Sequence, residues 1–298
     1  MHAAACTPSD LNILFGKSIL HNPPPFIGGS EGVGKVAAVG KRVSSLKVGD
    51  TVVPIWSTSW QGTWRSTARL LESELVRVPE NMPQEVAAHA SVSVATALRI
   101  LTDYVPLVNS DHVVLTGASS AVEQTIFCIL FYLQKALLQL ASRRGLNIVC
   151  VVKDDAERGF AQELGAWKAV NLQEFKALRM NNAALVADGT GGKMGATVAR
   201  SLKLRGCFLS YGDSSQQGIS LPIGGLIFND TYCRGFSMNR WVREQPENEV
   251  CTMVKEALSE AQGLRLLGSQ HFPVSEVERA VKAAGGESVA GGVVVLDC

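Results

Sequence analysis

The chain has 298 residues, 46% of them hydrophobic and 18% charged, and its 28 Lys and Arg against 27 Asp and Glu leave a formal net charge of +1. This length predicts two domains, because single hydrophobic cores usually stop growing at about 250–300 residues. The near-neutral charge gives no electrostatic argument for binding nucleic acid, and the scattered cysteines, without a CxxC spacing, disfavour a disulfide framework.

The first residues predict no targeting segment. Residues 1–8 lack a basic region followed by a long apolar run, and they lack the Arg-rich character of a transit peptide. The most apolar stretch, residues 126–133, is stopped by Gln134 and is shorter than the roughly 20 apolar residues of a membrane-spanning helix. We therefore expect neither a secretory signal nor a membrane span.

The first third predicts short strands and turns. Residues 33–40 and 51–55 are rich in β-branched residues and are separated by a polar turn at 47–50. Residues 63–70 alternate weakly and predict a further strand. A helical pattern then starts after Pro83 and continues to about residue 101.

The middle of the chain alternates between buried strands and helices. The predicted strands are residues 112–116, 147–152, 184–188 and 206–211. This alternation predicts an α/β domain with a doubly wound parallel sheet, covered by helices on both faces. From Pro246 onward the pattern predicts two helices and a last strand at 293–296.

The turn after the first buried strand is a candidate phosphate loop. Gly117 and the small residues after it, including Ser119 and Ser120, would let backbone approach a pyrophosphate at a helix N-terminus. Glu123 opposes this reading because its carboxylate would repel phosphate. The alternative is a small-residue turn without a ligand.

Lys153 follows the second buried strand, where a basic residue favours NADP over NAD. The alternative for this lysine is a solvated surface position. The helix predicted at residues 121–144 would span about 36 Å, against about 17–20 Å for its neighbouring strands, so it either overhangs the sheet or part of it loops out.

Several short motifs together carry a family resemblance. They lie at residues 7–12, 28–33, 46–50, 62–65, 95–99, 165–166, 210–212 and 234–236. In order and spacing the chain resembles the zinc-free medium-chain dehydrogenase/reductases, and within them the mitochondrial trans-2-enoyl-thioester reductases. The resemblance implies a Rossmann-type NADP-binding domain at 96–241. It would be inserted into a GroES-like substrate domain at 1–95 and 242–298 that lacks its opening strands.

The resemblance also implies an activity, which is hydride transfer from NADPH to the β-carbon of a 2-enoyl thioester. The thioester would be carried on acyl carrier protein or coenzyme A, in mitochondrial fatty-acid synthesis. Members of the family commonly pair through an edge strand of the nucleotide domain, which implies a homodimer in the mitochondrion. No metal is expected, because the turn at residues 29–32 offers no histidine to a zinc ion.

The resemblance implies cofactor contacts at particular positions. These are Ser93, Ser119, Ser120, Lys153, Tyr211, Gly212, Phe236 and Met238. Ser93 stands where the family usually has asparagine and would be a smaller donor in its place. The alternative for Tyr211 is a half-buried core residue.

Of four departures from the family, the one at Ser18 leaves the catalytic residue unknown. Ser18 stands where the family has a proton-donating tyrosine, and an aliphatic hydroxyl is a far weaker acid than a phenol. Residues 123–134 resemble an insertion. Two alternatives therefore stay open: a quinone or enone reductase of the same superfamily, and a non-catalytic homologue that binds a nucleotide or a protein partner.

Overall fold

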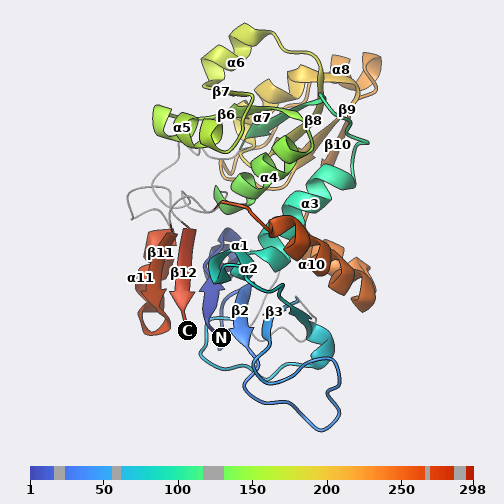
Figure 1. The fold of residues 1–298 in the computed structure, drawn as a ribbon. Helices are drawn as coiled ribbons and strands as arrows, with labels where there is room; N and C mark the ends of the chain where they lie inside the picture. Colours follow the sequence, from blue (N-terminus) through green and yellow to red (C-terminus); the bar gives the residue numbers. More distant parts are fainter. Residues whose placement is uncertain (17–23, 56–61, 117–130, 266–268, 285–292) are drawn as a thin grey trace. The chain divides into compact units, whose positions relative to one another are not determined.

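The computed structural model describes residues 1–16, 24–55, 62–116, 131–265, 269–284 and 293–298. The chain divides into two compact units (Figure 1). Unit 1 consists of Met1–Thr96 and Met238–Cys298, and unit 2 of Ala97–Ser237. Ser18, Ser119, Ser120 and Glu123 lie outside the described residues.

Unit 1 contains a mixed sheet with the strand order β11-β12-β1-β2-β3-β4. Its strands are β1 (Ala3–Ala5), β2 (Gly32–Lys35), β3 (Thr51–Pro54), β4 (Leu75–Arg77), β11 (Ser269–Pro273) and β12 (Val293–Asp297). Its helices are α1 (Pro8–Leu14), η1 (Glu72–Glu74), α2 (Gln84–Ala88), η2 (Ala90–Val94), α9 (Met238–Glu244), α10 (Glu247–Ala261), η4 (Val274–Glu276) and α11 (Val277–Lys282).

The first and last strands of the chain pair inside this sheet. β1 runs antiparallel to β12, with Ala3 opposite Asp297 and Ala5 opposite Val295. On its other side β1 pairs with β2. Ala4 is fully buried because it lies in an internal strand, where alanine leaves room for the neighbouring layers.

The strand predicted at residues 63–70 is wrong. The N–H groups of Thr63 and Trp64 donate instead to the carbonyls of Gly29 (3.2 Å) and Gly28 (3.0 Å), and the Trp64 indole donates to the Ala5 carbonyl at 2.9 Å. A Cβ on Gly28 would lie 2.5 Å from the Trp64 ring. The packing of this ring on a glycine turn outweighs the weak alternation of the sequence.

Unit 2 contains a parallel sheet with the strand order β10-β9-β8-β5-β6-β7. Its strands are β5 (His112–Thr116), β6 (Asn147–Val151), β7 (Lys168–Val170), β8 (Ala183–Asp188), β9 (Leu202–Ser210) and β10 (Tyr232–Gly235). Its helices are α3 (Ala95–Thr102, from Ala97 onward), α4 (Phe131–Arg143), α5 (Asp155–Glu163), α6 (Leu172–Leu178), α7 (Gly192–Val198), η3 (Ala199–Ser201) and α8 (Ile223–Phe228).

Helices cover both faces of this sheet, which confirms the predicted doubly wound domain. On one face, Val114 and Val186 belong to a core cluster with Phe175 of α6 and Val198 of α7. On the other face, side chains of α4 and α5 enclose a small cavity against β5 and β6. The strand order reverses between β5 and β8, which is where open α/β sheets bind ligands.

The helix predicted at residues 121–144 is described only from Phe131, where α4 begins, and it ends at Arg143. Residues 117–130 lie outside the described part of the chain.

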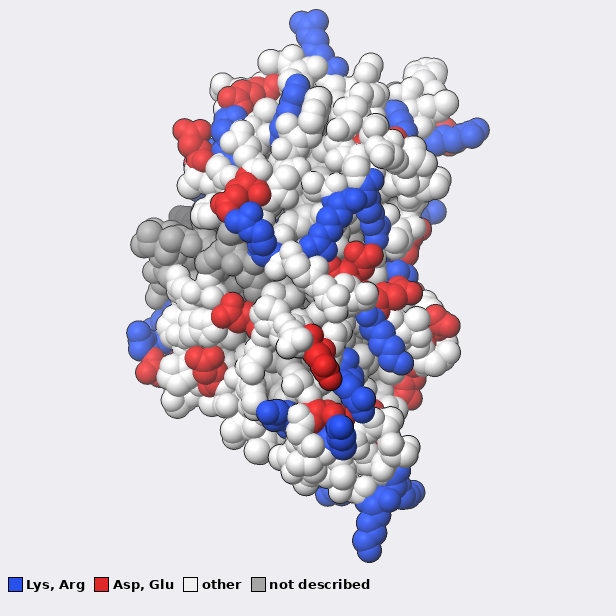
Figure 2. Space-filling model, in the orientation of Figure 1, with Lys and Arg blue, Asp and Glu red and all other residues white. Residues whose placement is uncertain are grey.

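No helix in the described part is long and apolar enough to cross a membrane. Acidic and basic side chains are interspersed on the face shown in Figure 2, in keeping with the near-neutral net charge.

His271 links a helix to the sheet of unit 1. Its Nε2 lies 2.9 Å from Oε1 of Glu85 on α2, and its Nδ1 lies 3.0 Å from Oδ1 of Asp297 on β12. Both contacts are hydrogen bonds only when both ring nitrogens carry protons. The hydrogen bond with Asp297, followed by the two negative charges, raises the pKa of His271 above its ordinary value.

We expect this ion pair to make unit 1 more stable at mildly acidic pH. The raised pKa means that the contribution is complete below about pH 6.5, the ordinary pKa of histidine, and is lost as the pH rises through the folded-state value. Because the side chains are partly exposed, the free energy of unfolding should fall by only about 0.5 kcal/mol. Urea unfolding of the wild type and of His271→Gln at pH 5.5 and pH 8 would measure this loss. If the two proteins differ in the free energy of unfolding by the same amount at both pH values, the prediction is contradicted.

Candidate functional site

The two strands at the reversal of the sheet are joined at their carboxyl ends. Thr116 ends β5, and its hydroxyl donates to Oδ1 of Asp188 at the end of β8. Oδ2 of Asp188 accepts the Gly191 N–H at 2.9 Å. Asp188 is fully buried, and this burial raises its pKa although the hydrogen bonds oppose the effect. Its carboxylate therefore shapes the loop that leaves β8.

Tyr211 connects a third strand to the same point. It follows β9, and its hydroxyl donates to the Thr116 carbonyl at 2.9 Å. The side chain of Gln134, in the first turn of α4, donates to that carbonyl at 3.0 Å. Burial raises the pKa of Tyr211 well above its ordinary value, so the phenol stays protonated and serves as a neutral donor.

The loops after β8 and β9 are held together by backbone contacts. Ser214 N–H donates to the Gly189 carbonyl at 3.2 Å, and Ser215 N–H donates to the Thr190 carbonyl at 2.9 Å. A Cβ on Gly212 would lie 2.9 Å from the Gly189 carbonyl oxygen. Residue 212 must therefore be glycine for the loops to approach this closely.

Two hydroxyl groups in these loops have no hydrogen-bond partner among the described residues. They are Oγ1 of Thr190 and Oγ of Ser214, and both atoms are buried. A buried polar atom left without a partner costs about 1–3 kcal/mol. The pair therefore suits a ligand that brings polar groups to the carboxyl ends of β8 and β9, as a dinucleotide does.

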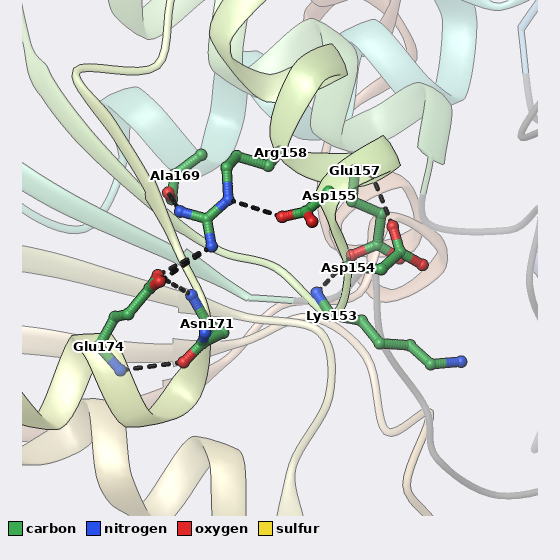
Figure 3. A network of polar contacts seen from close by, with 8 residues as sticks. All are labelled: Lys153, Asp154, Asp155, Glu157, Arg158, Ala169, Asn171 and Glu174. Carbon is green, nitrogen blue, oxygen red and sulfur yellow. Dashed lines mark hydrogen bonds and ion pairs between the residues drawn. The ribbon is translucent and has the colours of Figure 1, made fainter.

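At the end of β6, two carboxylates accept hydrogen bonds from backbone N–H groups next to the basic residue Lys153 (Figure 3). The N–H of Lys153 donates to Oε2 of Glu157 at 2.7 Å. Oδ1 of Asp154 accepts the Glu157 N–H at 2.9 Å and so caps the N-terminus of α5. The exposed Lys153 side chain points away from these carboxylates.

The second cation near this strand end is engaged within the protein (Figure 3). The guanidinium of Arg158 lies 2.9 Å from Glu174 and 3.3 Å from Asp155, and it donates to the Ala169 carbonyl at 2.7 Å. These contacts join α5 to β7 and α6. Arg158 therefore contributes to packing within unit 2.

Glu157 also faces the cavity between the sheet and helices α4 and α5. The cavity has a volume of about 50 Å³ and is lined mainly by apolar side chains such as Leu138 and Phe160. Burial raises the pKa of Glu157 to about 7. Its Oε1 has no hydrogen-bond partner in the described part of the chain.

In unit 1, Ser93 is one of the predicted cofactor residues. It lies in η2, and its hydroxyl donates to Oε1 of Glu31 at 2.5 Å. Its N–H donates to Oε2 of the same carboxylate at 3.0 Å. The serine hydroxyl expected to face the cofactor as a donor is already a donor to Glu31.

Phe236 and Met238 are both buried. Phe236 contacts Tyr104 edge-on, with 6.3 Å between ring centroids, and its N–H donates to the Ser210 carbonyl at 2.9 Å. Phe236 therefore lies beside the end of β9, which Tyr211 directly follows. Met238 begins α9 in unit 1.

The structure thus places Tyr211, Gly212 and Phe236 at the strand ends of unit 2. It places Lys153 at the end of β6. Sequence reasoning missed the other polar groups there, which are Thr116, Gln134, Asp188, Thr190 and Ser214. An aspartate directly after an apolar strand and before a run of glycines was the available signal. In the described part of the chain, no three His, Cys, Asp or Glu side chains form a potential metal site.

The chain is similar to known proteins over most of its length. Residues 1–80 match the alcohol dehydrogenase GroES-like domain, and residues 135–256 match the zinc-binding dehydrogenase family. The mitochondrial enoyl-[acyl-carrier-protein] reductase of Xenopus tropicalis is 31% identical over 86% of this chain and 72% of its own length. The Caenorhabditis elegans protein of the same name is 34% identical over 82% of this chain and 70% of its own.

A solved structure has the same fold. The complex of Etr1p with NADP and crotonyl-CoA superimposes with a TM-score of 0.83 at 23% identity, covering 100% of this chain and 89% of that one.

The close contact at Gly212 gives a direct test of the loop pair. Gly212→Ala should lower the free energy of unfolding by about 1–3 kcal/mol, because its Cβ meets a backbone oxygen that cannot move alone. Gly218→Ala is the matched control, since a Cβ there meets no atom within 4 Å. Denaturant unfolding of both variants would measure the difference, and equal stabilities would refute the contact.

Proposed function

The chain belongs to the family of the mitochondrial enoyl-[acyl-carrier-protein] reductases, and from this premise we propose that it reduces 2-enoyl thioesters with NADPH. The observation that carries the proposal is the pair of loops after β8 and β9, with the buried hydroxyls of Thr190 and Ser214 at the reversal of the sheet. The substrate would be carried on acyl carrier protein or coenzyme A. Because the named relatives are mitochondrial, we propose the mitochondrion as the location.

The residues that would hold the cofactor are those that the resemblance implies, together with the two buried hydroxyls in the loops after β8 and β9. Bound NADPH would supply a hydride to the β-carbon of the enoyl thioester. The proposed contacts are Ser93, Ser119, Ser120, Lys153, Thr190, Tyr211, Gly212, Ser214, Phe236 and Met238. Within unit 2, the neutral phenol of Tyr211 keeps the ends of β5 and β9 together, and the Lys153 ammonium would pair with the 2′-phosphate.

The reaction also needs a proton at the α-carbon of the substrate. Ser18 stands where the family has a tyrosine, and a positioned general acid contributes about 10²–10⁴-fold to the rate. We therefore propose that reduction is slow, with hydride transfer depending on orientation by the residues above.

Turnover of crotonyl-CoA tests the proposal. The purified chain should oxidise NADPH with saturation and form butyryl-CoA in equal amount. Lys153→Ala should raise the KM for NADPH about tenfold, equivalent to ~1.4 kcal/mol, because it removes the charge that faces the 2′-phosphate. The KM for NADH should be unchanged, and Lys176→Ala, an exposed lysine on α6, is the matched control.

Other outcomes would replace the proposal. Reduction of a quinone but not of crotonyl-CoA would favour the quinone reductase alternative. If tryptophan fluorescence shows no saturable binding of NADPH, the non-catalytic homologue is favoured.

A homodimer through unit 2 is the second part of the proposal. β10 is the edge strand of its sheet as described, so its outer backbone groups can pair with another strand. The adjacent α8 has no buried residue, and its side chains Ile223, Ile227 and Phe228 are 71%, 66% and 79% exposed. An apolar face of this kind beside an open strand suits a second copy of the same surface.

A charge on this face should separate the copies. We expect Phe228→Asp to shift the protein from dimer to monomer, because it places a carboxylate in a dry apolar interface. Val48→Asp changes an equally apolar side chain in unit 1 that is 61% exposed, and it serves as the control. Light scattering after gel filtration would give both masses. A wild type that is monomeric at micromolar concentration would reject the dimer.

A further inference from the structure

Glu31 is a buried carboxylate that the proposed reaction does not use. It precedes β2 and is fully buried. Its Oε2 accepts the N–H groups of Val92 and Ser93, each at 3.0 Å, and its Oε1 accepts the Ser93 hydroxyl at 2.5 Å. All of these donors lie in one short turn, so the carboxylate binds the backbone and the serine hydroxyl of that turn.

The turn is an irregular one. η2 is a π-helical turn between α2 and α3, closed by the N–H of Val94 donating to the His89 carbonyl at 3.1 Å. Single π-turns within helices are frequent at functional sites. Glu31 accepts two N–H groups of this turn and so fixes the position of Ser93.

The hydrogen bond also decides what Ser93 can offer to a ligand. A hydroxyl has one proton and two lone pairs. Because the proton of Ser93 is directed to Glu31, the hydroxyl can only accept a hydrogen bond from another group. Protonation of Glu31 would reverse this, since the carboxyl would become the donor and the serine proton would be released.

The charge of Glu31 is sensitive to pH in the neutral range. Burial raises its pKa to about 7, and the three hydrogen bonds lower it only in part. From α1, Asp10 adds a like charge that raises it further. Asp10 is itself buried, and desolvation raises its pKa to about 6 although Thr7 and Ser30 donate to it.

We infer that Glu31 is a positioning residue of the cofactor site, which holds Ser93 in the π-turn and makes its hydroxyl an acceptor. The partner of Ser93 is then a group with N–H or O–H donors, such as a carboxamide or a ribose hydroxyl. This inference rests on the proposed function, in which Ser93 contacts the cofactor.

Dissociation constants for NADPH at pH 6 and pH 8 test the inference. The wild type should bind more tightly at pH 8, where Glu31 is ionised. Glu31→Gln should bind NADPH about tenfold more weakly than the wild type at pH 8. Its dissociation constant should also change less between pH 6 and pH 8 than that of the wild type. Titration of the cofactor itself is common to both proteins. Glu74→Gln, at another buried glutamate of unit 1, is the matched control and should resemble the wild type.

A double-mutant cycle identifies the route. If Glu31 acts through the hydroxyl, Ser93→Ala should weaken binding similarly, and adding Glu31→Gln should cause little further loss. Ser93→Thr, which retains the hydroxyl, should restore the pH dependence. Additive losses, or a pH dependence in Glu31→Gln equal to that of the wild type, would overturn the inference while leaving the proposed function intact.

Hydrogen exchange separates the two proposals. If the wild type binds no NADPH, the proposed function fails, and the amides of Val92 and Ser93 decide the inference. Exchange at least about tenfold slower in the wild type than in Glu31→Gln at pH 8 supports it. Equal exchange rates reject it.

Discussion

The hydrogen bond from Thr116 to Asp188 joins the strands between which the parallel sheet reverses its order. Chain connections leave this point in opposite directions, so nothing in the covalent structure keeps the two strand ends together. Asp188 supplies the link from one side and also accepts backbone N–H groups of its own loop. Thr190 lies on the loop that starts at the end of β8, and the loop after β9, which carries Tyr211, Gly212 and Ser214, is held against it by backbone hydrogen bonds.

Buried carboxyl groups recur at the places where irregular backbone needs an acceptor. Asp188 serves the loop after β8, Glu157 the end of β6, Glu31 the π-turn and Asp10 the first turn of α1. In each case burial raises the pKa. A carboxylate is a strong acceptor, but removing it from water is costly. The protein thus trades stability at high pH for well-defined loops.

The sequence predicted the doubly wound sheet well, because long apolar strands alternate with helices and leave few other arrangements. It failed where side-chain contacts across distant segments decide the backbone. Residues 63–70 alternate like a strand, yet Trp64 packs on Gly28 and Gly29, which are more than thirty residues away. Likewise, Ser93 could be assigned to the site by resemblance, but no local pattern shows that its proton is directed to Glu31. Ser18, Ser119 and Ser120 lie outside the described residues and stay predictions.

The pairing of β1 with β12 has a consequence for how the chain is made. Unit 2 is one continuous segment, so it can fold as soon as residue 237 has been synthesised. Unit 1 cannot complete its sheet until Val295 and Leu296 are available to Ala5 and Ala4, almost the whole chain length later. During synthesis β1 can pair with β2, and β2, β3 and β4 with one another, but the other edge of β1 stays unpaired until β12 has been made.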